Sequence, residues 1–312
     1  MKKLVGFVAA ALLFLGGCGS ATLEGENTGS DTAKEKDASD LVVGVSLSTL
    51  NNPFFISVKE GITDVADDKG SQVKVLDAQD DTSKQSNDVD DLIQQGVDIL
   101  LINPVDSSAI TPAVEAANSA GIPVIAIDRS SEGGEVVTLV ASDNEEGGKM
   151  AAQYIEEISG TKAKVAELEG IPGASATRER GKGFNDYAKD KLDLVDKQTA
   201  NFDRAEGLTV MENMLQSKPE IEAVFAQNDE MALGAIEAIE AAGKTGKIQV
   251  VGFDGTDDGL DAIEAGTLSA TVAQQPEEMG KLAMQAAYDH FSGKKVEKSI
   301  ASPLELIKSG QK

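Results

Sequence analysis

The chain has 312 residues, 41% of them hydrophobic, and a formal net charge of −25. This length favours two domains, and the hydrophobic content is sufficient for their cores. The acidic charge argues against binding to nucleic acid or loose adsorption to anionic lipid, the single Cys excludes an internal disulfide, and the single His excludes a multi-histidine metal site.

The N-terminus has the pattern of an export signal. Lys2 and Lys3 precede an apolar run that is too short to span a membrane, and small residues follow it. The Leu-Gly-Gly-Cys sequence that ends at Cys18 resembles a lipobox, whose Cys becomes the lipidated first residue after cleavage. An ordinary secretory signal is the alternative, but the only Cys of the chain lies at this position. We therefore expect a signal peptide at 1–17 and a lipid anchor at Cys18, on the extracellular face of a Gram-positive cytoplasmic membrane.

The segment that follows is polar. Residues 19–40 contain Leu23 as their only large apolar residue. Such composition cannot bury enough apolar surface to fold. We expect 18–40, with the lipidated Cys, to be a flexible tether without fixed structure.

The first predicted strand, 41–48, leads into a turn and a helix. The strand is apolar and β-branched, which is typical of a buried parallel strand. Asn52 is placed to cap the helix and Pro53 to occupy its first position. In open α/β sheets, ligands bind at such strand-to-helix turns.

Two Phe residues lie at this turn. Phe55 is in phase with the apolar helix positions that follow it, so core packing competes with a ligand role. Phe54 lies about 100° away around the helix. We expect its ring to be exposed, where it suits a flat, hydroxylated ligand.

From residue 41 onward, predicted strands and helices alternate along the chain. This pattern favours parallel sheets with right-handed crossovers, and the number of units exceeds one typical sheet. The fold class is therefore α/β, with two doubly wound parallel-sheet domains. Strands are predicted at 41–48, 73–78, 98–103, 123–128, 137–142, 164–169, 194–200, 223–227, 248–253 and 268–274. Helices are predicted at 53–69, 83–95, 106–120, 144–159, 175–191, 203–217, 229–242, 256–265 and 277–292.

Five apolar strands end in Asn, Asp or Gln. We expect these ends to meet at the carboxyl edges of the two sheets. The alternative is that each residue only caps the next helix, which is as probable for any one position. It is weaker for the set, because Arg129 and Gln274 are not capping residues. The strand-end residues are Asn103, Asp128 with Arg129, Asn228 with Asp229, Asp254 and Gln274.

Two further residues are candidates for the same site. Arg178 and Arg180 point about 200° apart on a helix, so only one can face inward. Arg180 shares a face with apolar Phe184, and we expect Arg178 to be solvated. Phe202 is apolar between polar neighbours at a strand-to-helix junction, where core packing is the alternative.

The stretch Ser-Thr-Leu-Asn-Asn-Pro-Phe-Phe at 48–55 resembles the opening motif of bacterial ribose-binding proteins, in the type I periplasmic sugar-binding family. The likeness extends from about Leu41 to the C-terminus. It implies ligand contacts at positions that all carry the residue type of the family pattern, with Ser48 as a peripheral member. These positions are Asn52, Phe54, Phe55, Asn103, Asp128, Arg129, Arg180, Phe202, Asn228, Asp254 and Gln274.

These side chains suit a sugar. Each hydroxyl both donates and accepts, so Asp and Asn supply acceptors while Arg supplies forked donors. Three Phe rings and no Trp favour a compact pentose over a hexose.

The resemblance also places the crossovers between domains near Ser142, Gln274 and Ser302. It implies two discontinuous lobes joined by a three-stranded hinge. These are 41–142 with 275–302, the N-terminal sugar-binding lobe, and 143–274 with 303–312, the C-terminal one.

No dinucleotide-binding, phosphate-binding or nucleophile-elbow motif is present. Glu167 and Glu169 have the pattern of ordinary strand acids, and His290 is expected on a helix surface. We expect no catalytic residue, no metal and no cofactor.

The sequence therefore predicts a binding protein, not an enzyme, that delivers D-ribose to an ABC permease and is monomeric. Allose, another pentose or a furanosyl signalling molecule are alternative ligands in the same fold. A repressor core shares this fold, but it would carry a basic helix-turn-helix where this chain has an acidic segment. An enzyme built on the same sheets is a third possibility, which a turnover assay separates.

Overall fold

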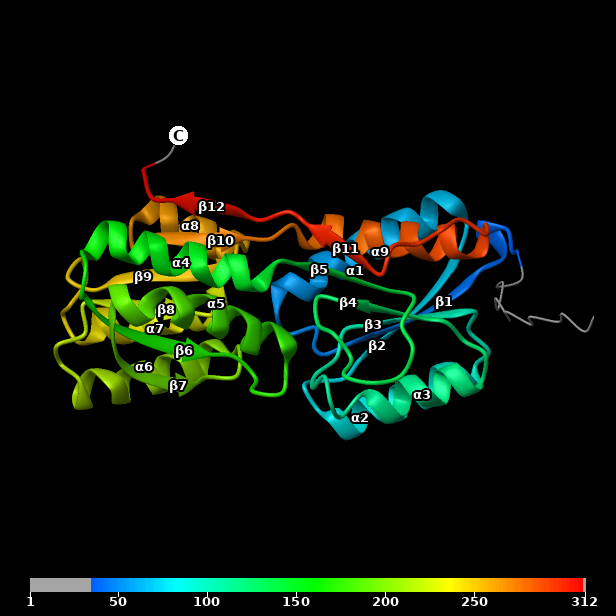
Figure 1. The fold of residues 1–312 in the computed structure, drawn as a ribbon, viewed down its shortest axis with the longest axis horizontal. Coiled ribbons are helices and arrows are strands. Elements are labelled where there is room, and N and C mark those ends of the chain that lie inside the picture. Colours follow the sequence, from blue (N-terminus) through cyan, green and yellow to red (C-terminus); the bar gives the residue numbers. More distant parts are fainter. Residues whose placement is uncertain (1–34, 311–312) are drawn as a thin grey trace, which may run out of the picture. The chain divides into compact units, whose positions relative to one another are not determined.

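The computed structural model describes residues 35–310, which form two six-stranded β-sheets with helices on both faces of each (Figure 1). The predictions for the signal peptide, for Cys18 and for the tether up to residue 34 lie outside the described residues. We call the sheet that contains β1, with its helices, lobe 1, and the sheet that contains β6, with its helices, lobe 2.

The sheet of lobe 1 has the strand order β11-β5-β4-β3-β1-β2, and all its strand pairs are parallel. Its strands are β1 (Val42–Leu47), β2 (Gln72–Asp77), β3 (Ile99–Ile102), β4 (Val124–Ile127), β5 (Thr138–Ser142) and β11 (Ser299–Ser302).

The sheet of lobe 2 repeats this order as β12-β10-β9-β8-β6-β7. Only β12 is antiparallel to its neighbour, β10. Its strands are β6 (Lys164–Glu169), β7 (Asp193–Thr199), β8 (Ala223–Ala226), β9 (Gln249–Asp254), β10 (Ala270–Ala273) and β12 (Glu305–Lys308).

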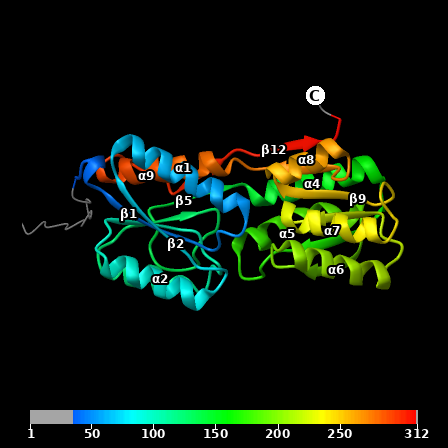
Figure 2. The same ribbon diagram turned by 180° about the vertical axis from the view of Figure 1, so that it is seen from behind.

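Each sheet has an apolar core on both faces, because successive residues of a strand point to opposite sides. In lobe 1, Leu101 packs under α1 and α9, whereas Leu100 and Ile102 pack under α2 and α3. In lobe 2, α4 and α5 cover one face, while α6, α7 and α8 cover the other (Figure 2). The helices are α1 (Pro53–Lys69), α2 (Thr82–Gln94), α3 (Thr111–Ser119), α4 (Asn144–Ser159), α5 (Ser175–Lys191), α6 (Arg204–Ser217), α7 (Asp229–Ala241), α8 (Asp257–Ala265) and α9 (Pro276–Phe291).

The chain passes between the two lobes three times. It leaves lobe 1 after β5, returns after β10 to form α9 and β11, and leaves again to form β12. The α/β fold with two doubly wound parallel sheets is confirmed. Strands β11 and β12 had no counterpart among the predicted strands, because four residues each carry too little periodicity.

Two local predictions were wrong. Residues 35–40, predicted as flexible tether, include a 3-10 helix (Ala38–Asp40) that is fixed by hydrogen bonds from Lys36 to Asp98 and from Ser71 to the Ala38 carbonyl. The third helix begins at Thr111 rather than at residue 106, because the Asp106 carboxylate holds the next amides in a turn.

Candidate functional site

A narrow cavity lies between the carboxyl ends of the strands of the two lobes. Every predicted ligand residue except Asn103 lines it, and Ala176 of α5 lines it too. No sequence pattern had marked Ala176 as a site residue, because a small apolar residue at a helix start is common. The lining residues are Asn52, Phe54, Phe55, Asp128, Arg129, Ala176, Arg180, Phe202, Asn228, Asp254 and Gln274.

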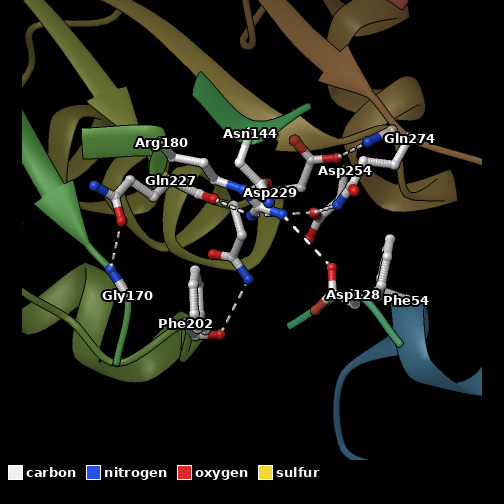
Figure 3. Close-up of polar contacts among 12 residues, drawn as sticks. Phe54, Asp128, Asn144, Gly170, Arg180, Phe202, Gln227, Asp229, Asp254 and Gln274 are labelled. Carbon is white, nitrogen blue, oxygen red and sulfur yellow. Dashed lines mark hydrogen bonds and ion pairs between the residues drawn. The ribbon is translucent and has the colours of Figure 1, made fainter. Parts of the chain in front are cut away.

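The two Phe rings at the start of α1 pack edge to face, with ring centroids 5.1 Å apart. Asn52 caps the helix by accepting from the Phe54 amide at 2.9 Å, as predicted. The prediction that Phe54 is exposed was wrong, because only 3% of it is accessible. The ring turns inward and contributes an apolar wall to the cavity (Figure 3).

Arg129 lies between two aromatic rings from different lobes. Its guanidinium carbon is 5.2 Å from the ring centroid of Phe55 in lobe 1 and 5.2 Å from that of Phe202 in lobe 2. Its terminal nitrogen donates to the Pro104 carbonyl at 3.0 Å. Burial lowers the pKa of Arg129, and the carboxylate of Asp128 opposes this. The guanidinium is therefore a fixed cation that lies over two rings at the cavity wall.

Arg180 is the inward-facing member of its pair, as predicted, and is 3% exposed, whereas Arg178 is exposed. Its Nε donates to Asn144 at 2.9 Å and a terminal nitrogen donates to the Gln227 carbonyl at 2.7 Å (Figure 3). The guanidinium also stacks at 3.8 Å over the Phe253 ring. These contacts fix the direction in which its remaining donors point.

Two buried carboxylates flank Arg180. Asp254 lies 3.5 Å away and Asp128 lies 4.0 Å away. Burial raises the pKa of Asp254 to about 8, with the positive charge of Arg180 opposing the rise. The site thus holds two acids and two guanidiniums close together, nearly without access to water.

Several polar atoms at the cavity have no hydrogen-bond partner among the described residues. They are Asp128 Oδ1, Arg129 Nε and Gln274 Oε1, all buried. Buried polar groups are nearly always hydrogen-bonded, so such a cluster marks a place for a ligand. Because it contains acceptors and a donor, it suits hydroxyl groups, which do both.

Asn103 lies behind the lining. Its amide donates to Asp128 Oδ2 at 3.2 Å and to the Ile127 carbonyl, while its oxygen accepts from the Ser48 amide. It therefore positions Asp128. The Ser48 hydroxyl is buried and has no hydrogen-bond partner among the described residues.

Among the five strand ends, helix capping explains only one. Asn228 accepts from the Met231 amide and caps α7. At the Asp254 end, Thr256 is the capping residue of the next helix, and Gln274 donates to Asp254 at 2.9 Å. Capping of the next helix therefore does not account for the polar residues at the other four strand ends.

Three lining residues have the positive backbone φ angle that favours glycine: Asp128 at 63°, Phe202 at 62° and Asp254 at 120°. Such conformations cost of order 1–3 kcal/mol each and persist only where the surroundings enforce them. Three such residues line this cavity. The fold therefore holds their side chains in fixed directions at a cost in local backbone stability.

The prediction that Glu167 is an ordinary strand acid was wrong. It is completely buried, and it accepts from Gln227 at 2.9 Å and from Asn185 at 3.0 Å. Burial raises its pKa to about 7. His290, expected on the surface, is half-buried with its ring edge-on to Phe291.

Among residues 35–310 there is no cluster of side chains suited to hold a metal ion. No helix in this part of the chain is long and apolar enough to cross a membrane.

Comparison with known proteins identifies relatives of this chain. Residues 43–295 match the model of the periplasmic binding protein domain. The ribose import binding protein of Bacillus subtilis is 58% identical over 98% of this chain and 99% of its own, and that of Escherichia coli is 47% identical over 98% of both. The structure of the Caulobacter myo-inositol binding protein, bound to myo-inositol, has a TM-score of 0.83 at 35% identity and covers 86% of this chain and 94% of that one.

Proposed function

This chain belongs to the periplasmic binding protein family, and from that premise we propose that it is an extracytoplasmic binding protein that captures D-ribose and delivers it to an ABC permease. It is a binding protein and not an enzyme. The observation that supports ribose most directly is the unpartnered set of buried acceptors and donor at the cavity, which matches a polyhydroxylated ligand. Among polyhydroxylated ligands, the high sequence identity to ribose import binding proteins favours ribose.

The proposed mechanism is closure of the two lobes around the sugar. Asn52, Phe54, Phe55, Asp128 and Arg129 come from lobe 1, with Asn103 supporting Asp128. Lobe 2 contributes Arg180, Phe202, Asn228 and Asp254, with Gln274 at the crossover. A sugar that contacts both sets favours the closed form by its differential affinity for that form.

The chemistry of each wall defines a role. The Phe rings contact the C–H faces of the sugar, the carboxylates accept from its hydroxyls, and the guanidiniums donate to its oxygens. Because Arg129 and Arg180 are held by other contacts, little ordering is required when the sugar binds.

We also propose that residues 41–142 with 275–302 and residues 143–274 with 303–312 move as the two domains. The three crossovers at β5, β10 and β11 are the hinge. The permease then recognises the pair of lobe faces that closure brings together, and the protein acts as a monomer.

The membrane attachment is a proposal from the sequence. Cys18 carries a lipid after removal of residues 1–17, and the following polar residues tether the body to the membrane. Replacement of Cys18 by Ser should release the protein into the medium of a Gram-positive host. Retention of this variant on the cells would contradict the lipid anchor.

Calorimetric titration tests the ligand. A form that begins after Cys18 is stripped of sugar by unfolding and refolding, and is then titrated with ribose, allose, other pentoses, myo-inositol, glucose and galactose. Heat is a suitable readout because the chain has no Trp. Tight one-to-one binding of ribose, with weak or no binding of glucose and galactose, is expected. Absence of ribose binding would contradict the ligand assignment.

A further inference from the structure

One buried acid next to the cavity does not line it. Asp229, the first residue of α7, is 0% exposed, and its carboxylate is surrounded by hydrogen-bond donors. Its Oδ2 accepts from the amides of Gly255 and Thr256 at 2.9 and 2.8 Å and from the Thr256 hydroxyl at 3.2 Å. Its Oδ1 accepts from the Thr271 hydroxyl at 2.7 Å. The carboxylate thus connects the segment that follows β9 to strand β10.

The backbone that Asp229 holds is strained. Asp254 is the last residue of β9 and has a φ of 120°, a conformation that L residues rarely adopt. The two residues after Asp254 are the ones whose amides Asp229 binds. These hydrogen bonds fix the backbone immediately after Asp254, and they offset the energetic cost of its strained φ angle.

The strained conformation has a directional consequence. It aims the Asp254 carboxylate at Arg180, at Gln274 and at the cavity, instead of letting it cap α8. The capping position is filled by Thr256, whose hydroxyl accepts from the Gly259 amide while it donates to Asp229.

The neighbouring sequence leaves room for this carboxylate. A Cβ atom at Gly252 or at Gly259 would overlap the Asp229 oxygens. Two small residues, one on β9 and one on α8, therefore enclose the acid on both sides. This close packing holds the Asp229 carboxylate in one position and keeps it away from solvent.

We propose that Asp229 is a positioning residue for ligand binding, which acts through the loop of residues 254–256 to direct the Asp254 carboxylate into the cavity. This inference rests on the proposed function of the cavity as a sugar site. Asp229 does not touch the sugar, so its effect is transmitted entirely by Asp254.

The experiment compares single and double variants by calorimetric titration with ribose. Asp229→Ala should weaken ribose binding at least about tenfold, the scale of losing a hydrogen bond to a charged group. The double variant Asp229→Ala with Asp254→Ala should bind as weakly as Asp254→Ala alone, because both changes remove the same contact. Full additivity of the two losses would overturn the proposal, as would unchanged binding by Asp229→Ala.

Two further variants separate positioning from general stability. Asp229→Asn should bind within a few-fold of the wild type, since its oxygen can face the amides of Gly255 and Thr256 while its NH₂ donates to Thr271. Gly259→Ala keeps the acid but displaces it, so it should weaken binding in the same direction. This variant also provides the test if Asp229→Ala does not fold.

Glu222→Ala is the matched control. The Glu222 carboxylate also binds a backbone amide of lobe 2, that of Lys164 at 2.8 Å, but at the opposite edge of the sheet. This change should lower the midpoint of unfolding and leave ribose affinity unchanged. Equal loss of affinity in the control would assign the effect of Asp229 to stability alone.

A series of monodeoxy riboses gives a readout that a purely structural role would not change. For one of these hydroxyls, its removal should cost Asp254→Ala less affinity than it costs the wild type. Asp229→Ala should show the same reduced loss of affinity for the same hydroxyl. Wild-type discrimination retained by Asp229→Ala would overturn the proposal. If the wild type does not bind ribose, the proposed function fails, and the same comparison with whichever sugar of the panel binds still tests Asp229.

Discussion

The amide of Ser107 in lobe 1 donates a hydrogen bond to the carbonyl of Gly173 in lobe 2 at 3.0 Å. Two more bonds join the lobes here, from the Ser175 amide to the Ser107 hydroxyl at 3.2 Å and from the Ser130 amide to the Ser175 hydroxyl at 3.0 Å. None of these residues lines the cavity. We call this group the lobe latch, and we expect it to influence affinity through the equilibrium between open and closed forms.

Gly173→Ala should weaken ribose binding about tenfold or more. A Cβ at Gly173 would overlap the Asp106 carboxylate across the lobe latch, and this carboxylate is held by the amides of Ser108 and Ala109. The overlap arises only when the lobes close, so the population of the binding-competent form falls. Calorimetry measures the affinity, and scattering of the sugar-free protein measures the closed fraction.

Ser107→Ala is the milder companion of this variant. It removes one neutral hydrogen bond, which corresponds to roughly a 2- to 12-fold loss of affinity. Because no residue of the lobe latch lines the cavity, both variants should weaken all bound sugars by the same factor. A change in the ranking of sugars would contradict this role.

Asp128→Ala and Arg180→Ala should each cost at least about 1.5–3 kcal/mol of ribose binding, the scale of hydrogen bonds to charged groups. Asp128 presents a buried oxygen without a hydrogen-bond partner among the described residues, and Arg180 is fixed by Asn144 and the Gln227 carbonyl. His290→Ala, a change in a half-buried residue of α9, is the control and should leave binding unchanged. Wild-type affinity in either site variant would remove that residue from the site.

Arg129→Lys should weaken ribose binding about tenfold although the positive charge is kept. The guanidinium lies over the rings of both Phe55 and Phe202, and a lysine ammonium lacks its planar, forked donors. Arg204→Lys is the matched control, because Arg204 pairs with Glu230 and Asp258 in lobe 2 and does not line the cavity. Equal affinity of Arg129→Lys and the wild type would show that only charge matters at this position.

Glu167→Gln should change how stability depends on pH. Burial raises the pKa of Glu167 from 4.5 to about 7, so the folded protein binds this proton more tightly than the unfolded chain. The wild type therefore loses stability as pH rises from about 4.5 through 7, and the variant lacks this loss. The free energy of unfolding of the variant relative to the wild type should rise by up to about 3 kcal/mol over this range.

Urea unfolding at pH 5, 6, 7 and 8 measures this difference. Above about pH 8, where Glu167 is ionised in both states, the two curves should run parallel. Parallel curves over the whole range would show that Glu167 has an ordinary pKa in the folded protein.

Local patterns in the sequence were sufficient to predict the fold and most of the cavity. Apolar runs predicted the buried strands β1, β3, β4, β8, β9 and β10, since buried parallel strands need continuous apolar residues. Asn52 and Pro53 marked the start of α1. The Asn52 side chain accepts a hydrogen bond from an amide of the first turn, and Pro53 has no amide hydrogen that would need a partner there. The polar ends of the strands then indicated which side chains would meet at one edge.

The tertiary structure decided what depends on distant partners. Phe54 became buried because its ring packs against Phe55 in the core cluster of lobe 1, which helical phase alone did not indicate. Glu167 acquired its raised pKa from burial behind Gln227, sixty positions away. The hydrogen bonds of Asp229 to the loop after Asp254 and to Thr271 form only when β9 and β10 lie side by side. Residue type and spacing are local properties, whereas burial, pKa and the direction of a side chain depend on which segments the fold brings together.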